Sequence, residues 1–409
     1  MNAAPMLLLD DAVARLLSRV PMPDASCAEA VSTFEARGRV LAVDVASQID
    51  VPPEDNSEMD GYAVRVADAA AAGAFLPVSQ RIAAGTVGCA LEPGTAARIF
   101  TGAQVPKGAD AVVMQERCTA ADGGVRIDDT PQPGQSIRRR GEDVKRGAVV
   151  LAAGQRLTPQ ALGMAAAVGA ATLQVGRRPQ VALFSTGDEL AMPGDVLKPG
   201  AIYNSNRFTL RALIESFGGR CDDLGIVPDR LDATRDALKR AAEGNDLIVT
   251  CGGVSVGEED HLKPAVEREG RLELWKIAIK PGKPLAFGEV FRSDGSPAWF
   301  VGLPGNPVSA YITFLLAVRP LLLRLQGATA LAPRPMAMRA DFAWPRPDKR
   351  REFLRVRRNG EGGLDIFRLQ GSGVLTSTVW ADGLVDNPAG TAIAAGDTVR
   401  YLSLAELLA

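Results

Sequence analysis

The strongest constraint on the fold is an alternation of short apolar runs and amphipathic stretches between residues 181 and 279. The apolar runs have strand length and lie at 181–184, 224–227, 247–250 and 272–279. Stretches with a helical spacing of apolar residues separate them, at 205–217, at 232–242 and after Asp260. Apolar runs of this kind are typical of strands buried on both faces of a parallel sheet. The sequence therefore predicts an α/β multidomain protein built on a doubly wound parallel sheet.

Three polar, turn-rich loops lie within or just beyond this alternation, at 251–260, 280–284 and 302–307. In the first loop, Gly252 and Gly253 allow a ligand to approach the main chain. The same loop supplies hydroxyl and carboxylate oxygens, which suit a hydrated magnesium ion, from Ser255, Glu258, Glu259 and Asp260. Open α/β sheets bind ligands beyond the carboxyl ends of their strands, so we expect these loops to form one site. The alternative is that the Gly-Gly pair is only a turn.

The charges of these loops do not fit a phosphate-binding P-loop. Glu258 and Glu259 stand where that motif needs Lys followed by Ser or Thr. Cationic groups appear instead at Lys280 and Lys283, which are bracketed by prolines that stiffen the backbone. Two ammonium groups held in one loop suit an oxyanion, although a solvated surface loop is the alternative.

Two further polar positions follow predicted strands of the same sheet. The segment 185–189 reads Ser-Thr-Gly-Asp-Glu and ends the first strand, and Asp229 follows the second. Because the carboxyl ends of parallel strands meet at one edge of the sheet, this edge is predicted to be rich in metal ligands.

The sequence outside this alternation has different patterns of apolar residues. Residues 9–20 have helical spacing, and between residues 41 and 143 short β-like runs are punctuated by Pro and Gly. Short β-like runs return after Met336, which predicts a C-terminal β-barrel-like domain. The predicted domains are an N-terminal linking and dimerisation region with helices at 1–47 and 144–178, a β-rich insert at 48–143, the α/β domain at 179–327 and the C-terminal β domain at 328–409.

The β-rich insert carries more polar residues than its turns require. An acidic loop leads through Asp60 into a predicted strand, and a second loop begins at Thr101. An alternative is that the polar residues 55–57 only bond their own backbone, as turn residues do. The cluster Arg138–Asp143 offers three arginines that suit a phosphate or carboxylate, but its arginines are equally suited to pair with Glu142 and Asp143.

Composition excludes several classes of protein. The 409 residues carry a formal net charge of −2, which argues against a general nucleic-acid binder because such proteins need a broad basic field. The five cysteines include no Cys-x-x-Cys pair, so neither a disulfide framework nor a structural zinc site is indicated. We find no secretory signal and expect no stretch of membrane-spanning length, which together predict a soluble, cytoplasmic protein with no membrane partner.

Jointly, these motifs resemble those of the molybdopterin molybdenumtransferases, the MoeA-type family that is related to the E domain of gephyrin. The matching motifs extend over most of the chain, at 55–65, 101–103, 139–143, 184–189, 252–257, 280–284 and 302–307. The glycine-rich motif is shared with the shorter molybdopterin adenylyltransferases, which lack the surrounding domains.

The resemblance implies an enzyme of molybdenum cofactor biosynthesis. Such an enzyme inserts molybdate into adenylylated molybdopterin, releases AMP and requires Mg²⁺. The resemblance also implies an elongated homodimer whose other partners are small-molecule substrates and possible contacts with a molybdopterin adenylyltransferase and with molybdoenzymes.

By the same resemblance, roles are assigned to individual residues. Catalytic roles fall to Asp60, Thr101, Asp143, Glu189, Asp229, Asp260, Lys276 and Lys280. Cofactor binding is implied for Ser185, Thr186, Gly187, Gly252, Gly253, Ser255, Gly257, Lys283, Pro304, Gly305, Asn306, Pro307, Arg350 and Ser372. The metal ligands would be Glu189, Asp229 and Asp260, and Asp60 and Thr101 would complete the site across the dimer interface. Arg355 is an alternative to Arg350 for the molybdate pocket.

Some positions depart from the family pattern or leave alternatives open. Glu54 and Glu58 replace apolar or small residues, which makes the surroundings of Asp60 more negative. His261, the only histidine, is interpreted as a packing residue rather than a general base. A noncatalytic scaffold remains an alternative function, and tungstate remains an alternative to molybdate because the two oxyanions are nearly isosteric.

Overall fold

The computed structural model describes residues 6–254 and 261–408 of the chain. Its central sheet has six strands in the order β16 (Arg220–Val227), β13 (Gln180–Thr186), β17 (Leu247–Cys251), β21 (Pro297–Leu303), β20 (Pro284–Phe291) and β18 (Gly270–Lys276). The first four strands are parallel, which confirms the predicted doubly wound arrangement. The sheet as a whole is mixed, because a tight turn joins β20 to β21 and makes these two strands antiparallel.

The predicted strand 272–279 is divided in the structure. β18 ends at Lys276, where its partner β20 begins with Pro284. The next residues form β19 (Ile279–Lys280), which pairs with β23 (Arg351–Arg358) of the C-terminal region instead. The turn at 281–284 therefore connects two different sheets.

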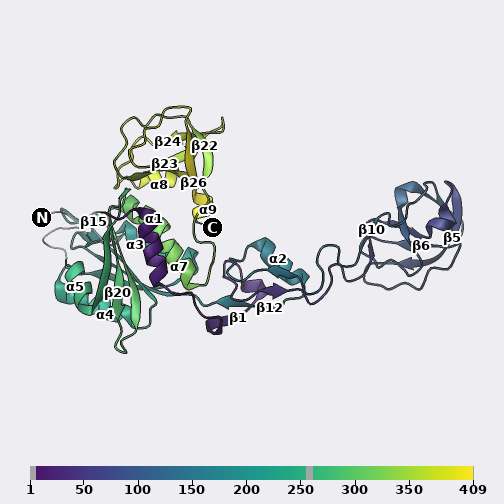
Figure 1. The fold of residues 1–409 in the computed structure, drawn as a ribbon, viewed down its shortest axis with the longest axis horizontal. Coiled ribbons are helices and arrows are strands. Elements are labelled where there is room, and N and C mark those ends of the chain that lie inside the picture. The colour runs from purple at the N-terminus through teal and green to yellow at the C-terminus, as the bar shows by residue number, and fades with distance from the viewer. Residues whose placement is uncertain (1–5, 255–260, 409) are drawn as a thin grey trace.

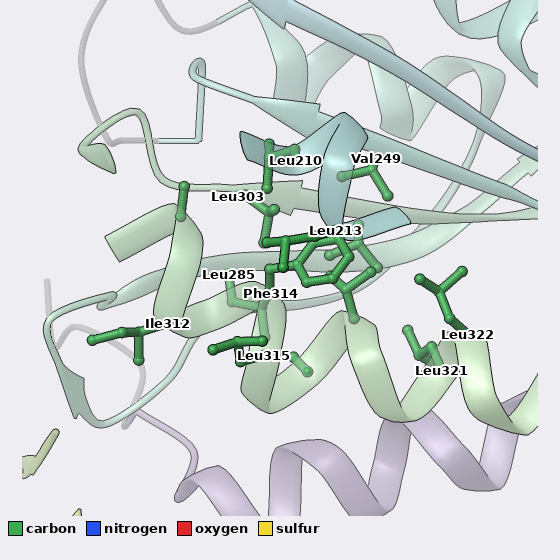
Figure 2. Close-up of a cluster of buried hydrophobic side chains, with 14 of the residues drawn as sticks. Leu210, Leu213, Val249, Leu285, Leu303, Ile312, Phe314, Leu315, Leu321 and Leu322 are labelled. Carbon is green, nitrogen blue, oxygen red and sulfur yellow. The ribbon is translucent and has the colours of Figure 1, made fainter. Parts of the chain in front are cut away.

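Helices cover both faces of the central sheet. One face packs against α3 (Ser205–Ser216) and a continuous helix made of α6 (Pro307–Thr313), the π-helical η5 (Phe314–Val318) and α7 (Arg319–Leu325). The helix α1 (Leu9–Arg19) lies outside α7, and Figure 2 shows the leucines and Phe314 filling the layer between sheet and helices. The other face packs against α4 (Leu231–Ala242) and α5 (Leu262–Glu269).

The helix Pro307–Leu325 corrects one expectation. Its 19 residues are long and apolar enough to span a membrane by length and composition, whereas we expected no such stretch. However, 78% of its most apolar window is buried inside the protein. The apolarity is therefore that of a core helix with neighbours on all sides.

The insert forms its own sheet at the far end of an elongated molecule (Figure 1). Its strand order is β7 (Ala111–Met114), β4 (Gly61–Val64), β6 (Ala96–Ile99), β5 (Ala74–Ile82), β9 (Gly124–Ile127) and β8 (Cys118–Ala121). Short 3-10 helices flank these strands at Val66–Ala69 and Gln115–Arg117.

A narrow linking region joins this sheet to the α/β region (Figure 1). It consists of two-stranded pairs, β1 (Ala28–Ser32) with β12 (Thr172–Gly176), β2 (Val45–Ala46) with β11 (Val149–Leu151), and β3 (Asn56–Ser57) with β10 (Ile137–Arg138). The helix α2 (Pro159–Ala167) packs here, and the Thr158 side chain caps its N-terminus by accepting a hydrogen bond from the Ala161 N–H. Short 3-10 helices also occur at Ala25–Cys27 and Thr33–Glu35.

The C-terminal region is a closed five-stranded barrel, which confirms the barrel-like prediction. Around the barrel run β23, β24 (Gly363–Ile366), β22 (Met336–Ala340), β26 (Thr398–Ser403) and β25 (Gly383–Asn387), and a β23–β25 pairing closes it. The short helices α8 (Thr376–Trp380) and α9 (Leu404–Leu407) follow strands of this barrel. The exact domain boundaries proposed from the sequence stay a prediction.

Replacing Phe314 by Ala is expected to destabilise the α/β region by about 3–5 kcal/mol, because the ring is fully buried and its loss leaves a cavity. Phe314 stacks on Phe217 with ring centroids 6.2 Å apart. Urea-induced unfolding measures the effect. Phe208→Ala is the control, since Phe208 is 52% exposed, and an equal loss in both variants would contradict this account of the core.

Candidate active site

The polar loops after β13, β17 and β21 meet at one edge of the central sheet. The backbone N–H of Gly252 donates to the carbonyl of Leu303 at 3.2 Å. Gly252 has φ +95°, and a Cβ on it would lie 2.5 Å from the carbonyl oxygen of Thr186. Only glycine fits between these loops. The predicted convergence is therefore found for the loops after β17 and β21, together with the end of β13. The loop 280–284 leads into β20, which begins where the antiparallel β21 ends and so lies at the same edge.

Part of the predicted glycine-rich loop cannot be placed. Ser255, Gly257 and Asp260 lie outside the described residues, together with Glu258 and Glu259. Their assigned roles in catalysis, cofactor binding and metal binding stay predictions.

Three hydroxyls near this edge of the sheet are buried and have no hydrogen-bond partner in the described structure. The hydroxyl oxygens of Ser185, Thr186 and Thr250 are buried and accept or donate no hydrogen bond within the described structure. Ser185 and Thr186 end β13, and Thr250 lies beside them near the end of β17. An unsatisfied buried hydroxyl costs roughly 1–3 kcal/mol, a cost that a bound polar ligand removes.

Asn206, which sequence reasoning missed, ties two of the loops together. Its Nδ2 donates to the Gly305 carbonyl at 2.6 Å and to Cys251 Sγ at 3.0 Å. Cys251 Sγ in turn donates to the Pro304 carbonyl at 3.2 Å. The sequence signal that could have found Asn206 is an amide side chain in the first turn of α3, a helix that begins at this edge of the sheet.

Cys251 is structural rather than reactive. Burial raises the pKa of its thiol to about 12, so the thiolate that attacks electrophiles or binds metals is disfavoured. Beyond Gly305, the loop continues into α6 with Asn306 as its N-cap and Pro307 at its first position.

The carboxylates of the edge surround Gly187. A Cβ on Gly187 would lie 2.6 Å from the Glu189 carboxylate, so the Glu189 side chain folds over this glycine. The backbone N–H of Asp229 donates to Asp188 Oδ1 at 3.1 Å, which joins the two carboxylate-bearing loops. Within residues 6–254 and 261–408, no three His, Cys, Asp or Glu side chains form a group that would hold a metal. The predicted set of metal ligands, which includes Asp260, stays a prediction.

Lys280 forms ion pairs with residues of the C-terminal barrel. Its Nζ donates to Glu352 Oε1 at 3.2 Å and lies 3.5 Å from Asp348 Oδ2. The Glu352 side chain is 1% exposed and also accepts from Trp344 Nε1 at 2.9 Å. A buried carboxylate needs such partners, so Lys280 holds the barrel against the sheet.

The other two lysines differ from Lys280. In the described structure, the exposed Lys283 makes no side-chain hydrogen bond or ion pair. Lys276 is half-buried at the end of β18, opposite Pro284.

Arg350 and Ser372 both lie where the barrel meets the α/β region. Arg350 pairs with Asp348, and this pairing holds the Asp348 pKa well below its usual range. Arg350 Nη1 also donates to the Ile279 carbonyl at 3.3 Å. The Ser372 carbonyl accepts from the Val308 N–H of α6 at 3.0 Å.

Arg355, the alternative to Arg350, is an interior residue. It is 1% exposed and donates to the Ser377 hydroxyl and to carbonyls of the barrel. Burial lowers its pKa to about 10.

The structure brings Asp60 and Thr101 together. The N–H and the hydroxyl of Thr101 donate to Asp60 Oδ1 at 2.8 and 2.7 Å. These two bonds lower the Asp60 pKa below 3.8, so the carboxylate is ionised at neutral pH. Both residues follow or precede strands of the insert sheet, which lies far from the central sheet in the same chain (Figure 1).

The arginine cluster of the insert pairs with the acidic loop rather than with the carboxylates that follow it. Arg139 bonds Asp55 at 2.7 Å, and Arg140 bonds Asp50 at 2.7 Å. Weaker contacts reach the two unusual glutamates, Arg138 with Glu58 at 3.8 Å and Arg140 with Glu54 at 3.7 Å. The added negative charge is thus balanced locally, and Asp143 remains exposed.

The remaining assignments concern His261 and the turn residues of the acidic loop. His261 precedes α5 and makes no side-chain capping bond. Ser57 bonds the backbone of Met59 in the manner of a turn residue, whereas Asp55 bonds arginines across the loop.

Three family models match the chain in succession. They are the MoeA N-terminal region (domain I and II) over residues 7–169, a probable molybdopterin binding domain over 182–324 and the MoeA C-terminal region (domain IV) over 337–404. The chain belongs to the MoeA family of molybdopterin molybdenumtransferases. It is accordingly a transferase of molybdenum cofactor biosynthesis.

Individual MoeA-family proteins resemble the chain over nearly its whole length. The molybdopterin molybdenumtransferase of Haemophilus influenzae is 40% identical over 98% of this chain and 100% of its own. That of Nostoc is 35% identical over 98% of this chain and 94% of its own. The crystal structure of a molybdopterin biosynthesis MoeA protein from Pyrococcus horikoshii has a TM-score of 0.84 and 28% identity, covering 98% of this chain and 100% of that one.

Gly252→Ala is expected to destabilise the protein by about 1–3 kcal/mol more than Gly295→Ala, because a Cβ at 252 meets the Thr186 carbonyl. Gly295 has a similarly positive φ of +81° but open space around its Cβ position, so it controls for backbone strain alone. Urea-induced unfolding compares the two variants. Equal losses would mean that the loops do not meet as described.

Proposed function

We propose that this enzyme inserts molybdate into adenylylated molybdopterin, releases AMP and requires Mg²⁺. The observation that carries the proposal is the set of unpartnered buried hydroxyls at Ser185, Thr186 and Thr250, next to the glycine-lined contact of three loops. A bound pterin or phosphate beyond the strand ends would satisfy the hydroxyls of Thr186 and Thr250, which share one face of the sheet, and the glycines would let it reach the main chain. The names of the curated relatives support the reaction class.

Mg²⁺ fits the residues of this edge without a dedicated protein cage. Such an ion usually takes one or two carboxylates and completes its coordination with water and substrate phosphate oxygens. Glu189 and Asp229, on loops that Asp188 joins, would hold it with Asp260. When bound, the ion would neutralise charge on the phosphoanhydride that is cleaved.

The neighbouring basic groups suit the anionic substrates. The exposed ammonium of Lys283 is available for phosphate or molybdate, and Lys276 lies at the adjacent strand end. Lys280 would act by fixing the barrel, which in turn positions Arg350 and Ser372 at the boundary where we infer the molybdate pocket.

We infer that the active form is a homodimer with sites shared between chains. The inference rests on the ionised Asp60, which Thr101 orients in the insert of the elongated chain, far from its own α/β loops (Figure 1). The insert of a second copy would supply Asp60, Thr101 and Asp143 to these loops.

We also propose two classes of protein partner, a molybdopterin adenylyltransferase and molybdoenzymes. The proposed location is the cytoplasm, whose reducing conditions suit the five free cysteines.

Purified protein should release AMP from adenylylated molybdopterin only when molybdate and Mg²⁺ are both added. Thr186→Val should raise KM for that substrate by about tenfold, because one hydroxyl contact is lost. The change should not destabilise the ligand-free protein, since this buried hydroxyl has no protein partner there. Thr119→Val, an exposed change in the insert, is the control and should behave like the wild type. Tight substrate binding without any AMP release would instead indicate a carrier or scaffold.

Mixing two inactive variants tests the shared site. The first variant carries Asp60→Asn. The second carries Thr186→Val together with Ser185→Ala. Each variant alone should lose most of its activity. After the subunits exchange, the mixture should recover about a quarter of wild-type activity, because half of the dimers are mixed and each holds one intact site. No recovery after demonstrated subunit exchange would place both groups in the site of a single chain, contrary to the proposal.

A further inference from the structure

A basic cavity of about 940 Å³ lies away from the proposed active site, where the linking region, the α/β region and the C-terminal helix meet. Residues 37–39 and 154–159 line it from the linking region, and α3 and α7 line it from the α/β region. Its five arginines are Arg37, Arg39, Arg156, Arg178 and Arg319. Its only acidic lining residues among those described are Glu215 and Glu406.

Arg319 lines this cavity, is buried and has no ion-pair partner among the described residues. It is 7% exposed, and its Nη1 donates to the Leu331 carbonyl at 3.0 Å. Its Nε is buried and has no hydrogen-bond partner, and no carboxylate of the described residues forms an ion pair with it. A buried guanidinium left this way is costly unless an anion completes its bonding.

Arg156 and Arg319 both approach the aromatic ring of Phe217. Their guanidinium carbons are 5.8 and 5.6 Å from the centroid of Phe217. Arg156 donates only to backbone carbonyls, those of Gly38 at 3.1 Å and Ser216 at 3.0 Å. Burial lowers the pKa of Arg319, and the nearby charge of Arg156 lowers it further. The positive charge of Arg156 therefore acts unfavourably on Arg319, and a bound anion would offset this repulsion.

The two glutamates of the cavity only partly offset this charge. Glu215 pairs with Arg211 at 3.0 Å. Glu406 accepts the backbone N–H of Arg334 at 2.9 Å, and its charge acts on Arg319 without forming an ion pair with it. Arg39 has its own partner, Glu29, outside the cavity lining, but its Nε also lacks a hydrogen bond. The lining therefore keeps an excess of positive charge.

We propose that this cavity binds a small compound bearing phosphate groups. Guanidinium forks match phosphate oxygens bidentately, and the volume suits a small metabolite rather than a single ion. The cavity is distinct from the proposed active site. The helix α3 touches the active-site loop at Asn206 and the cavity at Ser216, about 15 Å further along the helix axis. An occupant would join the linking region to the α/β region.

Isothermal titration of the full-length protein with inorganic pyrophosphate at low ionic strength tests the proposal. The wild type should bind about one pyrophosphate per chain, and Arg156→Gln and Arg178→Gln should each weaken binding by about tenfold or more, because each removes a charged hydrogen-bond donor. Arg117→Gln removes an exposed arginine of the insert that does not line the cavity, and it should bind as the wild type does. Thermal unfolding of each variant verifies that it is folded.

Two results would overturn the proposal. The first is the absence of saturable binding to the wild type. The second is binding that survives both arginine changes but is lost in Thr186→Val, which would place the pyrophosphate at the loops of the proposed active site. Because AMP release does not enter this experiment, its failure would leave the proposed reaction unaffected.

Discussion

The side-by-side alignment of the parallel strands β13, β17 and β21 determines how the α/β region is arranged. Their side chains are almost all buried between two helix layers, so the hydrophobic effect holds the sheet together. The hydrogen-bonded register then places Ser185 beside Cys251 and Cys251 beside Leu303. Three loops that are distant in sequence must consequently leave the sheet at one level. Their small residues allow them to touch.

A second constraint couples the barrel to that sheet. The strand β19 leaves the central region and pairs with β23 of the barrel, and Lys280 at its end neutralises the buried Glu352. This places the ammonium group in a structural ion pair rather than in open solvent. The strand pairing and the ion pair together tie the segment between β18 and β20 to the barrel.

The linking region gives the molecule its length. Its paired strands have only two to five residues each, and they carry the insert far from the central sheet (Figure 1). Asp60 is pre-oriented by Thr101 at that distant end. At the other end of the linking region, Arg156 bonds both Gly38 and Ser216, so the arginine cavity lies at the joint itself.

The sequence by itself determined the α/β core, the barrel-like C-terminal region and the edge of the sheet at which the polar loops lie, because apolar periodicity and glycine placement are local properties. Through a resemblance it also assigned Asp60 and Thr101 to one site, and the structure shows that the two side chains are hydrogen-bonded. Only the tertiary structure decided the antiparallel β20, the ion pair of Lys280 with Glu352 and the role of Asn206, since each depends on which distant segment lies alongside. The same holds for the basic cavity, whose arginines come from segments up to 282 positions apart, Arg37 and Arg319, and whose charge is unbalanced only in three dimensions.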